Sequence, residues 1–218
     1  MLEYIIKGQI MMIPLMVCSV VAIGVVFDRG WAFYKHRSLD NRALRASILD
    51  LLEQGEIKAA TVLCGSTPGP VSAVLLSGLQ SYSKHKPLQK RVESLRAMMK
   101  EAMADYSMHA MSAVERRFPV LQTVGNAAPL LGMTGTVVGM ITAFAAMRES
   151  GVSGSAVAGG ISEALITTAA GLIIALLAIV PLNWFVSEAD RIELEIEAAS
   201  AELLEFVATR VEVEHAVS

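Results

Sequence analysis

The chain has 218 residues, of which 54% are hydrophobic and only 18% charged, and its mean hydropathy is +0.52. Soluble domains carry about 25% charged residues, so this composition excludes an ordinary soluble protein and indicates a membrane protein. The formal net charge is −3, and we expect no nucleic-acid partner. Cys18 lies in an apolar segment and Cys64 in a polar one. Two such cysteines give neither a disulfide framework nor metal-ligand spacing, and we expect plain thiols, no metal and no cofactor.

Residues 10–27 contain no charged side chain and predict the first transmembrane helix, because a span needs about 20 apolar residues. A cleaved signal peptide is the alternative. Only Lys7 precedes the segment, however, whereas Arg29 and Lys35 follow it, and no small-residue cleavage site closes it. The positive-inside rule therefore places residues 1–9, a short N-terminal segment, in the periplasm.

Residues 28–117 predict a cytoplasmic domain made of helices. A first helix from Asp40 ends at Gly55, because glycine commonly terminates helices, and two shorter helices follow it. From Leu88 the composition predicts one long helix that reaches the membrane and enters it at Phe118. No segment shows the alternation of a strand, so the predicted fold class is an all-α membrane protein.

Two further apolar runs predict the second and third spans, at 118–147 and 158–186, joined by a periplasmic loop over 148–157. Residues 187–218 then form a cytoplasmic C-terminal helix, so that long helices extend from the membrane into the cytoplasmic domain. This tail carries a stripe spaced by four and three residues, which indicates packing against a neighbouring helix of the same assembly. Its positions are Ile192, Ile196, Ala199, Leu203, Phe206, Arg210 and Val213.

The two cytoplasmic segments differ in charge. Residues 28–117 have 14 basic and 9 acidic side chains, a net charge of +5, and the tail has 2 basic and 9 acidic ones, a net charge of −7. Opposite charges of this size can attract the segments across a subunit boundary. Two solvated helical surfaces with no mutual contact are the alternative, and the sequence leaves both open.

Glu163 is the only ionisable residue between 150 and 187. A carboxylate charged near the centre of a membrane helix costs about 2.5–3.5 kcal/mol, so a residue kept there usually handles ions. A position facing water near the membrane surface is the alternative. At about 100° per residue, Thr167 lies within about 40° of Glu163, whereas Thr168 lies about 140° away.

Small residues share a face with these polar groups in both spans. They either line a shared polar interior or pack the helices against each other, and packing is favoured for most of the glycines. In the second span the face holds Gly132, Thr136, Gly139 and Ala143, and in the third Gly160, Glu163, Thr167, Ala170 and Gly171.

Three stretches resemble the MotA/TolQ/ExbB proton-channel family, in its ExbB and TolQ branch, over roughly residues 10–190. They read APLLGMTGTVVGMITAF, GGISEALITTAAGL and AATVLCGSTPGPVSAVLLSGL. The resemblance implies a ring-forming homo-oligomer of five copies around the single helices of two ExbD-like or TolR-like partners, whose intramembrane Asp would be the main proton carrier. Proton flow would drive work that passes to a TonB-like or TolA-like protein, in the inner membrane of a bacterium.

The resemblance also assigns the pore-lining residues Thr136, Glu163 and Thr168. The helical wheel favours Thr167 beside Glu163, whereas the family pattern favours Thr168; we expect Thr168 and keep Thr167 as an alternative. The chain departs from the family where a proline usually follows the third-span glycine by six residues. That position is Leu177 here, and the proline comes at Pro181.

Several alternatives stay open. An ExbB-like, a TolQ-like and a gliding-type envelope motor all fit the motifs. A different class of function is also open: the chain could be a passive membrane scaffold, with Glu163 near the outer surface of the membrane. Sodium could replace the proton, because hydroxyl and carboxylate oxygens ligate hard cations. The four histidines accompany no catalytic motif, so we do not expect an enzyme.

Overall fold

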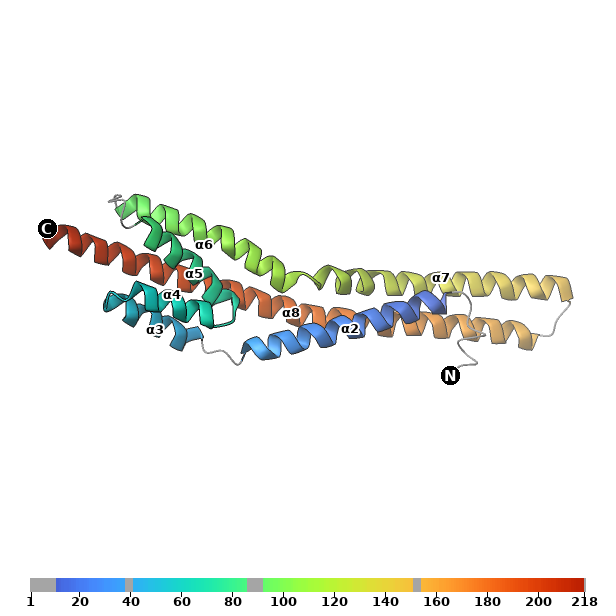
Figure 1. Cartoon of the computed structure of the whole chain (residues 1–218). Coiled ribbons are helices and arrows are strands. Elements are labelled where there is room, and N and C mark those ends of the chain that lie inside the picture. The colour runs from blue at the N-terminus through green and yellow to red at the C-terminus, as the bar shows by residue number, and fades with distance from the viewer. Residues whose placement is uncertain (1–10, 38–40, 86–91, 151–153, 218) are drawn as a thin grey trace. The chain divides into compact units, whose positions relative to one another are not determined.

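The computed structural model describes residues 11–37, 41–85, 92–150 and 154–217, and the described residues form seven helices and no strand. The predicted all-α fold is therefore confirmed (Figure 1). The helices are α2 (Met12–Arg37), α3 (Asn41–Glu53), α4 (Ile57–Ser66), α5 (Pro70–His85), α6 (Val92–Glu115), α7 (Phe118–Ser150) and α8 (Gly154–Val217).

Three of the helices are long and apolar enough to cross a membrane, as the sequence predicts. The candidate spans lie within Met12–Lys35, Phe118–Arg148 and Val157–Thr209, and the most apolar 18-residue window of each has a mean hydropathy of 1.9, 1.7 and 2.5. The third stretch has 53 residues, whereas a span needs about 20. Helix α8 therefore continues well beyond the length that a membrane requires.

The chain divides into two compact units. The membrane unit comprises Met1–Trp31 and Arg117–Val186, and the second unit comprises Ala32–Arg116 and Ser187–Ser218. Helices α2 and α8 contribute residues to both units.

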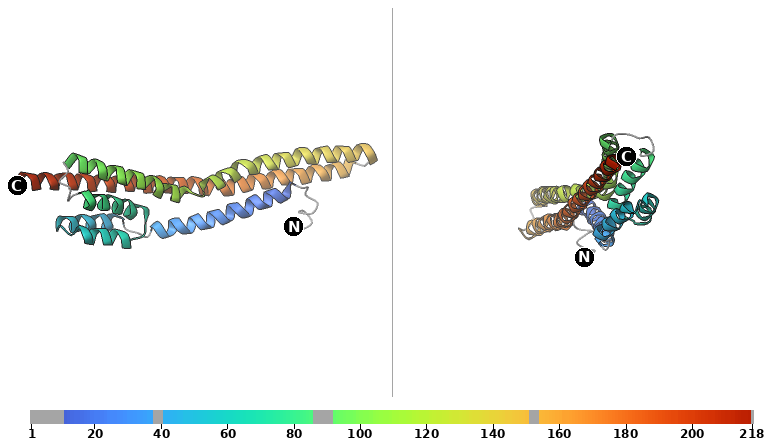
Figure 2. Two further views of the ribbon diagram at one scale, coloured as in Figure 1. Left: turned by 45° about the horizontal axis from the view of Figure 1, so that its top comes forward. Right: turned by 90° about the vertical axis from the view of Figure 1, so that its left-hand side faces the viewer.

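In the membrane unit, α7 and the first part of α8 run side by side (Figures 1 and 2). They are antiparallel, because Gly125 lies against Ile179 at one end of the pair and Ala143 lies against Gly160 at the other. Near the first of these ends, the rings of Phe118 and Phe185 stack with their centroids 6.3 Å apart. Both rings are buried and belong to the apolar core of the unit.

One predicted element is wrong. The sequence predicts a continuous helix from 88 to the membrane, but α6 ends at Glu115 and α7 begins at Phe118. The cause is Pro119, which has no backbone N–H and whose ring would clash with the carbonyl of Glu115 in a continuous helix. Proline is well tolerated in the first turn of a helix, and Pro119 lies in the first turn of α7.

The second unit packs α3, α4, α5 and α6 with the tail of α8. Gly55 ends α3 as predicted, with a φ of +80°. The N–H of Glu56 donates to the Leu51 carbonyl at 2.9 Å, and the N–H of Gly55 donates to the Leu52 carbonyl at 3.1 Å. These two bonds form a Schellman motif, which satisfies the last carbonyls of α3 and turns the chain into α4.

The predicted tail stripe packs inside the same chain. Its first four positions, Ile192, Ile196, Ala199 and Leu203, are buried, and Phe206 is half-buried. Leu203 reaches Gly78 of α5, where an added methyl group would lie 3.3 Å from it. The side chains of Arg210 and Val213 lie outside the described residues.

The two oppositely charged segments also meet within one chain. Arg45 of α3 forms an ion pair with Glu202 of α8 at 3.4 Å, and the Asn41 amide donates to the Glu195 carboxylate at 2.5 Å. Attraction between the segments therefore does not require a second subunit. The ion pair is partly exposed, and such pairs contribute about 0–1 kcal/mol.

Candidate ion-pathway site

Glycines lie where the backbones of α7 and α8 come close together. A methyl group at Gly171 would lie 2.5 Å from the carbonyl oxygen of Ala128 and 3.1 Å from the Cα of Gly132. A methyl group at Gly132 would lie 3.1 Å from the Cα of Thr168. Only hydrogen fits at these positions, because backbone lies on the other side. The packing interpretation of these glycines is thereby confirmed.

Thr168 connects the two helices through its hydroxyl group. Its Oγ1 donates a hydrogen bond to the carbonyl oxygen of Gly132 at 2.8 Å, from α8 to α7. The residue is half-buried. A hydroxyl that donates one bond keeps lone pairs that can accept a bond from water. Thr168 can therefore hold the helix pair together and still interact with a water molecule on its exposed side.

Thr167, the alternative that the helical wheel favours, lies inside the helix contact. It is 3% exposed, and its Oγ1 donates to the carbonyl oxygen of Glu163 at 3.2 Å, one turn back on the same helix. Its Cγ2 would lie 2.7 Å from a methyl group at Gly135. Thr167 thus follows the usual behaviour of a threonine in a membrane helix, which bonds its own backbone and packs its methyl group.

Thr136 and Glu163 are both partly exposed. The Thr136 hydroxyl donates to the carbonyl of Met133 in its own helix at 2.7 Å. Among the described residues, no hydrogen bond or ion pair engages the carboxylate of Glu163. Glu163 is therefore available to water or to another chain.

The structure thus brings the four predicted residues into two kinds of environment. Thr167 is sealed between α7 and α8, whereas Thr136, Glu163 and Thr168 each keep an accessible side. Chemically, the accessible group consists of two hydroxyls and one carboxyl, and the carboxyl is its only acidic group. Across the described chain, no three His, Cys, Asp or Glu side chains gather in a way that could hold a metal ion.

Two features of the site were missed by the sequence analysis. One is the carbonyl of Gly132, which accepts the hydrogen bond from Thr168. The small residues on one face of each span indicate that the two helices pack together, but they do not give the register. The other is an ion pair at one end of the span of α2, where Arg117 Nη1 lies 2.8 Å from Asp28 Oδ2. The only signal for this pair in the sequence is that both charges flank apolar runs.

Taken together, the apolar helices and the small-residue contact define an all-α membrane protein that spans the membrane several times. Comparison with known sequences identifies its relatives. A sequence model of the MotA/TolQ/ExbB proton channel family matches residues 67–198. This match covers more than half of the chain, and the chain belongs to that family.

Individual relatives come from both named groups of the branch. The biopolymer transport protein ExbB-like 1 of Synechocystis sp. is 32% identical over 191 residues, covering 86% of this chain and 71% of the relative. ExbB of Neisseria meningitidis is 29% identical over 175 residues, covering 78% of each chain. The Tol-Pal system protein TolQ of Haemophilus influenzae is 27% identical over 209 residues, covering 91% and 85%. The predicted ExbB and TolQ branch is confirmed.

Proposed function

We propose that this chain is the ring-forming subunit of a proton-driven motor in the bacterial inner membrane. The observation that carries the proposal is Glu163, the only ionisable residue of α8 within the membrane unit, whose carboxylate is accessible and unpaired among the described residues. In a chain of a proton channel family, such a carboxyl is suited to pass protons along the helix.

In the proposed complex, several copies, five by analogy with the family, surround an ExbD-like or TolR-like single-span helix. Residues 1–9 face the periplasm, and the second unit lies in the cytoplasm. Thr136 and Thr168 orient water beside Glu163, and the complex passes motion to a TonB-like or TolA-like protein. No cofactor takes part in this scheme.

The energy available is sufficient for such a role. One elementary charge that crosses a potential of 100 mV releases about 2.3 kcal/mol. A free energy of this size shifts a two-state helix arrangement by about fiftyfold, since each 1.4 kcal/mol is a factor of ten. One or a few protons per step can therefore bias a mechanical cycle.

Purification of the tagged chain from its native membrane in mild detergent tests the proposal. Mass spectrometry identifies the proteins that accompany it, and native mass measurement gives the number of copies. We expect a small single-span protein with an intramembrane Asp, bound at fewer copies than this chain. A TonB-like or TolA-like companion distinguishes the ExbB-like from the TolQ-like role. A homo-oligomer with no such partner, even after crosslinking in cells, would contradict the motor and favour a passive scaffold.

A further inference from the structure

One face of α2 points away from the rest of the membrane unit. Its positions are spaced by four and three residues, which places them on one side of a helix. Six of the seven carry large side chains that are 58–77% exposed. They are Ile13, Val17, Val20, Gly24, Phe27, Trp31 and Tyr34. The other side of the helix is packed, since Leu15 and Ala22 are each 1% exposed.

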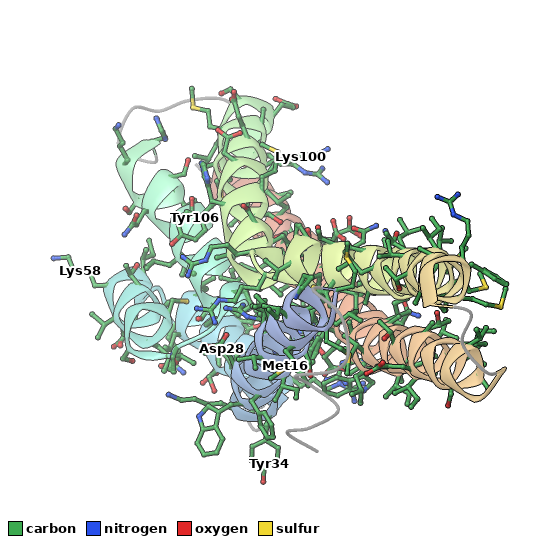
Figure 3. The ribbon with its side chains drawn as sticks, turned by 90° about the vertical axis from the view of Figure 1, so that its right-hand side faces the viewer. Met16, Asp28, Tyr34, Lys58, Lys100 and Tyr106 are labelled. Atoms are coloured by element: carbon green, nitrogen blue, oxygen red, sulfur yellow. The ribbon has the colours of Figure 1, made fainter. Side chains whose placement is uncertain are left out.

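The chemistry of this outward stripe changes along the helix. Its first half is aliphatic, and its last three members are the aromatic residues Phe27, Trp31 and Tyr34. Figure 3 shows the side chain of Tyr34 projecting outward from α2. Trp and Tyr concentrate where a membrane meets water, because their rings are apolar and their N–H and O–H groups are polar.

The ion pair between Asp28 and Arg117 lies at the end of the uncharged part of α2, where we expect the apolar core of the membrane to end. Both side chains are partly exposed, at 41% and 38%. With a rise of 1.5 Å per residue, Trp31 lies about 4.5 Å beyond Asp28 and Tyr34 about 9 Å beyond it. The headgroup layer on each side of a bilayer is about 5–7 Å thick. Trp31 therefore lies within this layer, and Tyr34 lies just beyond its water-facing edge.

Lipid fits this face better than a second helix does. Where helices of this chain meet closely, glycines lie at the contact, as with Gly171 against Gly132. The outward stripe has a single glycine, Gly24, and a methyl group there would meet nothing within 4 Å. Bulky side chains prevent the close approach that holds helices together in a membrane.

We propose that the aromatic end of this stripe binds the headgroups of anionic phospholipids. Residues 28–37, at the end of α2, contain three basic residues and one acidic one. A basic segment next to a span attracts anionic lipid. The indole N–H of Trp31 and the hydroxyl of Tyr34 can donate to phosphate oxygens. The inference requires only that α2 spans the membrane, and it is independent of proton transport.

The two tryptophans of the chain, Trp31 and Trp184, allow a direct test. The Trp184→Phe variant of the full chain leaves Trp31 as the sole tryptophan, and the Trp31→Phe variant serves as the matched control. Both are reconstituted into phosphatidylcholine vesicles that contain a small fraction of brominated lipid, either phosphatidylglycerol or phosphatidylcholine. Bromine placed near the headgroup or near the end of the acyl chain reports depth by quenching tryptophan fluorescence.

We expect bromine near the headgroup to quench Trp31 more than bromine near the chain end. Brominated phosphatidylglycerol should quench it severalfold more than the same fraction of brominated phosphatidylcholine, and high salt should remove this difference. Quenching by neither lipid would show that protein, such as a second copy of the chain, covers the face, and would overturn the proposal. Equal quenching by both lipids would overturn the assignment to anionic headgroups.

Discussion

The hydroxyl of Thr168 on α8 donates to the backbone carbonyl of Gly132 on α7 at 2.8 Å. Gly132 also lies against Gly171, one turn further along α8. A methyl group added at Gly171 would lie 3.1 Å from the Cα of Gly132. The bond therefore lies at a close approach of the two helix backbones. A side-chain hydroxyl at this place fixes the register of the pair more strictly than apolar packing alone would.

Two replacements of Thr168 distinguish the effect of its hydroxyl group from the effect of its side-chain volume. Thr168→Val keeps the volume and removes the donor, and we expect it to abolish energised transport and to lower stability by about 0.6–1.7 kcal/mol, from the average to the largest value measured for interhelical hydrogen bonds in a membrane protein. Thr168→Ser keeps the donor and should retain most of the activity. The measurements are growth that depends on the transport system and thermal unfolding in detergent. Equal activity of the two variants would contradict a role for the hydroxyl.

The close approach of α7 and α8 predicts a large effect at Gly171. Gly171→Ala places a methyl group 2.5 Å from a backbone carbonyl, which cannot move as a side chain can. We expect a loss of about 1–3 kcal/mol, as for other overpacked sites. Gly159→Ala is the control, because nothing lies within 4 Å of the added group. The measurement is the thermal unfolding midpoint of the two variants in one detergent, and we expect a lower value for Gly171→Ala. Similar values would show that the helices are not in contact at Gly171.

Gly55 tests the turn between α3 and α4. Its φ of +80° lies in the left-handed region, so Gly55→Ala should cost about 1–2 kcal/mol through backbone strain alone. Gly65→Ala provides the matched comparison, because Gly65 is helical and has open space around it. Chemical denaturation of the purified chain should show a loss for the first variant and little change or a gain for the second. The reverse order would be inconsistent with the Schellman motif.

Cys64 is predicted to be unreactive. Burial raises the pKa of its thiol to about 11 from an ordinary value of 9.0, so almost no thiolate is present at neutral pH, and the thiolate is the reactive form. Alkylation by a maleimide at neutral pH should be slow in the folded chain and fast after denaturation. Cys18→Ser removes the other thiol and isolates the signal. Rapid labelling of the native protein would refute the burial of Cys64.

The same thiol gives a pH dependence of stability. The folded pKa is higher than the unfolded one, so the unfolded chain loses its proton first as pH rises. The stabilisation is complete below pH 9 and is lost as the pH approaches 11. Cys64→Ala should remove this part of the alkaline loss. Unfolding curves of the two proteins across that pH window provide the comparison.

Much of the fold follows from the sequence because its signals are local. Uninterrupted apolar runs predict the three spans, and Gly55 predicts the end of α3. The break before Pro119 could have been predicted, since proline lacks a backbone N–H and is favoured in the first turn of a new helix. The prediction of a continuous helix rested on the composition, which favours helix on both sides of Pro119. An average over many residues does not show the effect of a single proline.

The arrangement of the site depends on contacts that the sequence does not specify. Helical spacing correctly places Thr167 near Glu163 on α8, where it bonds the Glu163 carbonyl. Spacing within one helix carries no information on the neighbouring helix, and it therefore does not reveal that Thr168 bonds Gly132 or that Thr167 is sealed against Gly135. That register is set by glycines on both helices at once.

Proton flux tests the central claim most directly. The chain and the partner purified with it are reconstituted into vesicles with an internal pH dye, and a potassium diffusion potential drives uptake. We predict acidification that needs no sodium and that falls by about tenfold or more in Glu163→Gln, which keeps the shape of the side chain but cannot carry a proton. Glu197→Gln, which changes an exposed side chain on the tail of α8, should leave the flux unchanged. Equal flux through Glu163→Gln and the unaltered chain, or uptake that requires sodium, would contradict the proton pathway.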